Sequence, residues 1–166
     1  MRLMLMRHAK TKNGQDKEDF HRMLTDTGKK QASQAADFLY EYQIDKILIS
    51  HVKRAMQTSS IINEKLPTDT KELEMVSELY EGDAEAVINL ITSQEDRNKY
   101  LLVIGHNPFI YNVAISLSNS NSDKYNELIA TSMPTARIVI IEFRDIDSWK
   151  KILTRKGDII GVFTPV

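Results

Sequence analysis

Apolar residues form four short continuous runs along the chain, at residues 3–6, 47–49, 101–104 and 138–141. Runs of this length are typical of strands that are buried on both faces of a sheet. A fifth, short strand is predicted near residues 73–76. These runs predict the central strands of one sheet.

Between the runs, apolar residues recur at helical spacing. This spacing predicts helices over residues 32–40, 52–66, 84–91 and 110–117, and a short helical piece at 124–129 follows a polar stretch. Alternating strands and helices favour an α/β fold of three layers, α/β/α, with a mostly parallel central sheet. In such folds the ligand site lies beyond the carboxyl ends of the strands.

The length and composition fit one folded domain over residues 1–166. Basic residues (22) and acidic residues (23) nearly cancel, so the broad positive surface of a nucleic-acid-binding protein is not expected. The chain has no cysteine, which excludes disulfides and a cysteine nucleophile and suits a reducing compartment. With no apolar run as long as a membrane span, we expect a cytoplasmic protein without a membrane partner.

Basic and imidazole side chains directly follow three of the predicted strands. Arg7 and His8 follow the first, His51 and Arg54 follow the second, and His106 follows the run at 101–104. Parallel strands bring these residues to one edge of the sheet, where clustered positive charge requires a compensating anion. The simplest ligand for this cluster is a phosphate.

Each residue type in the cluster has a chemical role in phosphoryl transfer. A neutral imidazole can take up a phosphoryl group covalently near pH 7. Arginine side chains can hold phosphoryl oxygens in a bidentate manner, and a second imidazole can donate to the developing charge. No metal or other cofactor is then required.

Other phosphate chemistries do not fit the sequence. A Walker A loop is missing, and Asp145 and Asp147 follow the last predicted strand too late for an aspartyl-phosphate phosphatase.

Four stretches of the sequence resemble motifs of the histidine phosphatase (phosphoglycerate mutase-like) superfamily. They occur in the family's order and run through nearly the whole chain. The short length resembles the SixA-type phosphohistidine phosphatase branch. One departure is an alanine where the first motif of the family usually has glycine. The motifs are Arg7-His8-Ala9, residues 24–32, residues 50–58 and Gly105-His106-Asn107.

The resemblance implies a role for each of five residues. His8 is the nucleophile, Arg7 and Arg54 hold the phosphate, and His106 binds the phosphate and stabilises the transition state. Glu81 stands where many members carry the proton donor, although some SixA-type members lack it. The implied substrate is a phosphohistidine domain of a protein or a small phosphorylated metabolite.

The expected reaction is hydrolysis of such a substrate through a phosphorylated His8. Two other functions remain open for this pattern. One is a phosphoglycerate mutase-type transfer, although the short chain between Glu81 and residue 101 leaves little room for a covering insertion. The other is a non-catalytic phosphate-binding module, which would not need His8. The role of the segment at 9–25 is open as well: we expect its Arg22 to be a solvated charge rather than a substrate contact, and His51 to face away from the cluster.

Overall fold

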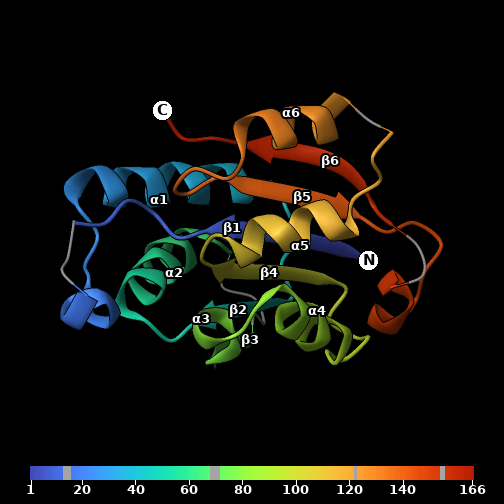
Figure 1. Cartoon of the computed structure of the whole chain (residues 1–166), viewed down its shortest axis with the longest axis horizontal. Coiled ribbons are helices and arrows are strands. Elements are labelled where there is room, and N and C mark those ends of the chain that lie inside the picture. The colour runs from blue at the N-terminus through green and yellow to red at the C-terminus, as the bar shows by residue number, and fades with distance from the viewer. Residues whose placement is uncertain (13–15, 68–71, 122, 154–155) are drawn as a thin grey trace.

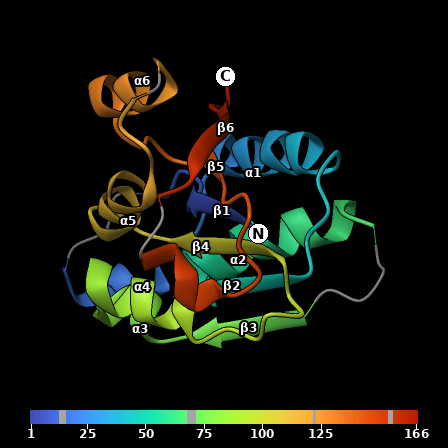
Figure 2. The ribbon, with the colours of Figure 1, turned by 90° about the vertical axis from the view of Figure 1, so that its right-hand side faces the viewer.

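The computed structural model describes residues 1–12, 16–67, 72–121, 123–153 and 156–166 and shows a six-stranded sheet between two layers of helices (Figures 1 and 2). The order across the sheet is β3-β2-β4-β1-β5-β6. The strands are β1 (Arg2–Arg7), β2 (Lys46–Ser50), β3 (Glu72–Val76), β4 (Tyr100–Gly105), β5 (Ile138–Glu142) and β6 (Asp158–Phe163).

The expected three-layer α/β/α architecture is confirmed. Strands β3, β2, β4 and β1 are mutually parallel, whereas β5 pairs antiparallel with β1, and β6 pairs antiparallel with β5 at the edge of the sheet. Strand β6 was not predicted from the sequence. Of its six residues only Ile159 is buried, so it lacks the apolar run that identifies the central strands.

Successive residues of each central strand pack into two separate cores. Leu3 and Leu5 of β1 point to one core, and Met4 and Met6 point to the other. Among the described helices, none is both long and apolar enough to cross a membrane. Helices α1 (Asp26–Leu39) and α2 (Lys53–Lys65) cover one face, and the other is covered by α3 (Glu78–Glu81), α4 (Ala84–Thr92), α5 (Phe109–Leu117), α6 (Asp123–Thr131) and η2 (Trp149–Leu153) (Figure 2).

The segment between β1 and α1 is more structured than the sequence indicated. It contains a short 3-10 helix, η1 (Asp16–His21), and Thr11 pairs with Leu24 in an isolated bridge; residues 13–15 lie outside the described part. Gly28 in the first turn of α1 allows this segment to pack closely, because a Cβ there would lie 2.0 Å from the Lys10 carbonyl oxygen. The segment is thereby held beside the end of β1.

Candidate active site

His8 and His106 meet because β1 and β4 are neighbouring parallel strands. Arg7 pairs with Gly105 at the ends of these strands, and the His8 amide donates to the Gly105 carbonyl over 3.0 Å. The next residue on each chain segment is therefore a histidine at the same edge. The two ring centroids are 4.9 Å apart.

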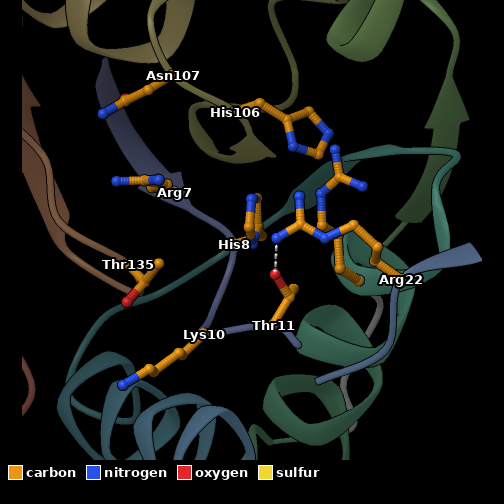
Figure 3. A pocket seen from close by; sticks show the side chains of 9 residues that line it. Arg7, His8, Lys10, Thr11, Arg22, His106, Asn107 and Thr135 are labelled. Atoms are coloured by element: carbon orange, nitrogen blue, oxygen red, sulfur yellow. Dashed lines mark hydrogen bonds between the residues drawn. The ribbon is translucent and has the colours of Figure 1, made fainter. Parts of the chain in front are cut away.

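A cavity of about 350 Å³ opens at this edge of the sheet (Figure 3). Four of its lining residues are cationic, two are histidines, and none is acidic. Within the described residues, no group of three or more His, Asp or Glu side chains is arranged to hold a metal ion. The lining consists of Arg7, His8, Lys10, Thr11, Arg22, Arg54, His106, Asn107 and Thr135.

The His8 ring is held in a form suited to nucleophilic attack. Its Nδ1 lies 2.8 Å from the Ala9 carbonyl oxygen, which can only accept a hydrogen bond, so Nδ1 carries the proton. Burial lowers the pKa of His8 to about 4, assisted by the charges of Arg54 and Arg7 and opposed by the bond to Ala9. At pH 7 the ring is therefore neutral and Nε2 offers a free lone pair.

His106 is also neutral, for a similar reason. Its pKa is lowered to about 2, first by burial and then by the nearby His8 and Arg54. The side chain is only 6% exposed. At neutral pH it can thus donate one hydrogen bond from whichever ring nitrogen carries the proton.

Several polar atoms of the cavity residues are buried without a partner in the described structure. They include three nitrogens with hydrogen-bonding capacity: Nε of Arg7, Nε of Arg54 and Nδ1 of His106. Leaving a buried polar group unpaired costs on the order of 1–3 kcal/mol. An oxyanion is the ligand that best suits unpaired donors among cationic lining residues, which is the chemical basis for regarding the cavity as a phosphoryl site.

Asp19 on η1 is a component of the site that sequence reasoning missed. Arg54 donates from one terminal nitrogen to the Asp19 carbonyl oxygen (2.6 Å) and from the other to its carboxylate (3.0 Å). The same carboxylate accepts from Arg22 and from the Tyr80 hydroxyl. Although burial alone would raise it, the pKa of Asp19 falls to about 2 through the Arg22 and Tyr80 hydrogen bonds and the Arg54 charge. A permanent anion therefore fixes two cavity arginines.

Arg22 lines the cavity rather than standing free in solvent, contrary to our expectation. Its three guanidinium nitrogens donate to the Lys12 carbonyl, the Asp19 carboxylate and the Thr11 hydroxyl. Figure 3 shows the bond from Arg22 to Thr11. The sequence offered one indication, since Arg22 lies two residues before the motif that begins at Leu24. The weak apolar periodicity of the segment at 9–25 gave no information on which way the Arg22 side chain points.

Residues of the family-like motifs hold the chain that follows His8. Thr58 accepts from the Ala9 amide (3.1 Å) and donates to the Arg54 carbonyl (2.7 Å), linking the nucleophile segment to α2. Gln31 accepts from the Lys10 amide (3.0 Å). Ala9 is not among the described residues with positive φ, so its backbone needs no glycine.

Glu81 and His51 lie outside the cavity lining that the described residues form. Glu81 is the exposed last residue of α3. It adjoins Tyr80, whose ring centroid is 5.7 Å from that of His106, so α3 passes close to the site. His51 packs against Phe20, with ring centroids 5.1 Å apart. The role of Glu81 as proton donor stays a prediction.

We expect Arg54→Lys to lower kcat/KM by at least about tenfold. A lysine ammonium retains the charge but lacks the planar fork, so it cannot both hold Asp19 at two points and donate to a phosphoryl oxygen. Steady-state kinetics on p-nitrophenyl phosphate measure the loss. Arg97→Lys is the matched control, because Arg97 is an exposed arginine that pairs with Glu72 and Glu95. Equal kinetics for the two variants would place Arg54 outside the functional site.

Known proteins resemble this chain in sequence and in fold. The "Uncharacterized phosphatase PhoE" of Bacillus subtilis (strain 168) is 27% identical over 180 residues, covering 88% of this chain and 90% of that protein. The structure of the putative phosphohistidine phosphatase SixA of Nakamurella multipartitia superposes with a TM-score of 0.84 at 21% identity, covering 99% and 96% of the two chains. That of the protein histidine phosphatase SixA complexed with tungstate gives 0.77 at 21% identity, covering 99% and 97%.

The structural similarities establish a shared fold over nearly the full length of the chain. Family membership rests on the sequence, in which residues 3–100 match the model of the histidine phosphatase superfamily (branch 1). This range includes Arg7, His8, Arg54 and Glu81, and His106 lies beyond it. With more than half of its length matched, the chain belongs to the histidine phosphatase superfamily, branch 1.

Proposed function

We propose that this protein is a metal-independent phosphatase that hydrolyses phosphohistidine on a protein, or a small phosphomonoester, through a phosphohistidine intermediate on His8. The observation that carries the proposal is the set of unpaired buried nitrogens around a neutral histidine with a free Nε2. A cavity with these donors and cationic side chains suits the negative oxygens of a phosphoryl group in transfer.

In the first step, the Nε2 lone pair of His8 attacks phosphorus and forms the N–P bond. The bond from phosphorus to the leaving group breaks, and its electron pair stays on the leaving oxygen or nitrogen. Arg7 and Arg54 neutralise charge on the phosphoryl oxygens, and His106 adds a hydrogen bond. These residues supply the positive charge for which other phosphatases use a metal ion.

In the second step, water attacks the phosphoryl group and the N–P bond breaks, which releases inorganic phosphate and regenerates His8. Glu81 is the proposed acid that protonates the leaving group in the first step and accepts the proton of the water in the second. Its exposed position suits an acid that serves a substrate bound at the mouth of the cavity.

The open mouth of the cavity supports a substrate that extends beyond it. The cavity of about 350 Å³ holds a phosphoryl group and a small attached group, and the rest of a larger substrate would lie outside. A phosphohistidine displayed on a protein domain meets this requirement, and the similar fold of a protein histidine phosphatase supports it. We place this activity in the cytoplasm, in keeping with the absence of cysteine.

The test is to trap the phosphoenzyme in the presence of EDTA. The protein is mixed with radiolabelled phosphohistidine protein, sugar phosphate or nucleotide and quenched in alkali, in which phosphohistidine survives. We expect a label that is stable in alkali, labile in acid and located on His8, together with release of inorganic phosphate.

Each other outcome identifies a different function. Transfer of the label to a second acceptor hydroxyl without release of phosphate would indicate a mutase. Tight phosphate binding without any label would indicate a non-catalytic module. Loss of labelling in EDTA that a divalent ion restores would contradict metal independence.

A further inference from the structure

The two ring nitrogens of His106 have different surroundings. Nε2 lies 2.8 Å from the hydroxyl oxygen of Ser50. Nδ1 is buried and has no partner among the described residues. Figure 3 shows the ring with Nδ1, the nitrogen nearer the side-chain stem, on the side of His8. The proton of this neutral ring can sit on either nitrogen, and its location decides whether the cavity meets an N–H donor or a lone pair.

Ser50 is placed for this contact by the sheet. It ends β2, which lies beside β4, and His106 directly follows β4. Ser50 is completely buried. In the part of the chain that the structure describes, His106 Nε2 is the one group that bonds to its hydroxyl.

The number of donors and acceptors that Ser50 and the His106 ring offer each other favours one tautomer of the ring. A serine hydroxyl has one proton to donate, and a buried donor needs an acceptor. If Nε2 carried the ring proton, the hydroxyl proton of Ser50 and the lone pair of Nδ1 would both be buried and unpaired. If Ser50 donates to Nε2, one unpaired N–H remains, and it lies on the side of His8.

We infer that Ser50 is a positioning residue: its hydroxyl donates to Nε2 of His106, keeps the ring proton on Nδ1, and so makes His106 a hydrogen-bond donor to the phosphoryl group on His8. This inference deepens the proposed function and rests on it. The wrong tautomer would direct a lone pair at a phosphoryl oxygen, and the resulting repulsion would grow as charge develops in the transition state. A hydroxyl outside the cavity thereby decides whether His106 attracts or repels a phosphoryl oxygen inside it.

The first experiment is ¹⁵N NMR of the histidine rings in the unliganded protein, in wild type and in Ser50→Ala. We expect wild-type His106 to be the Nδ1–H tautomer, and Ser50→Ala to shift it toward Nε2–H. Ser50→Thr, which retains the hydroxyl, should restore the wild-type pattern. A wild-type spectrum with the proton on Nε2 overturns the inference, whether or not any variant folds.

The second experiment measures the rate of His8 phosphorylation in the same variants. We expect Ser50→Ala to lower this rate by about tenfold or more, with a smaller change in KM, because the interaction strengthens in the transition state. Ser118→Ala is the matched control, since Ser118 is equally buried but follows the far end of α5. An unchanged rate in Ser50→Ala overturns the inference. Absence of a phosphoenzyme in the wild-type protein contradicts the proposed function instead. The NMR spectrum still tests the tautomer of His106 in that case, because it is recorded on the unliganded protein.

Discussion

His8→Ala is expected to abolish the phosphoenzyme and to lower turnover on the order of 10⁴-fold or more, as removal of other enzyme nucleophiles does. The variant should still bind phosphate or tungstate weakly, because Arg7, Arg54 and His106 are held by contacts that do not involve the His8 ring. Arg7 donates to the Met133 carbonyl, Arg54 to Asp19, and His106 contacts Ser50. Alkaline-quench labelling and calorimetric titration with tungstate measure the two properties separately.

His21→Ala is the control for this variant, since His21 is an exposed histidine on η1 that does not line the cavity. It should form the phosphoenzyme at the wild-type rate. Near-normal turnover by His8→Ala would show that another group is the nucleophile. Loss of labelling in both variants would instead indicate a general disturbance of the site rather than removal of the nucleophile.

Glu81→Gln should slow phosphoryl transfer in proportion to how much the leaving group needs a proton. An alkyl alkoxide is strongly basic, so we expect a loss of about 10²-fold or more on an alkyl phosphate. Nitrophenolate leaves without a proton, so the loss on p-nitrophenyl phosphate should be small. Phosphohistidine should be affected least or to an intermediate degree, because its imidazole leaves easily once the ring is protonated.

The quantity to compare is the rate of His8 phosphorylation, since a slow second step would mask the difference in turnover. Glu78→Gln is the matched control, as Glu78 is an exposed glutamate on the same short helix. Equal slowing of all three substrates would mean that Glu81 positions the site or activates water in the second step. No slowing would make it a surface acid, as its exposed position allows.

The positions of the central strands and the main helices could be predicted because both are local properties of the chain. A continuous apolar run indicates burial on two faces, and a 3.6-residue period indicates one buried helix face. The same local reasoning placed Arg7, His8 and His106 at the ends of strands. Since parallel strands end at one edge, their convergence followed without knowledge of the strand order.

Contacts between distant segments could not be predicted, because composition and periodicity do not report which side chains meet. Asp19 bonds to Arg54 across 35 residues, and Ser50 bonds to His106 across 56. Neither pair has a sequence pattern, and Arg22 was taken for a solvated charge for the same reason.

The three-layer fold, the sheet edge that carries the chemistry and the residue types that suit a phosphoryl group could all be inferred from the order of residues along the chain. The tertiary structure alone decided the antiparallel addition of β6, the anchoring of two arginines by Asp19 and the placement of Glu81 outside the cavity lining. The local pattern of apolar and polar residues indicates which side of each segment faces the solvent and which faces the core. Hydrogen bonds between buried polar groups depend instead on strand order and register, which become fixed when the whole chain packs.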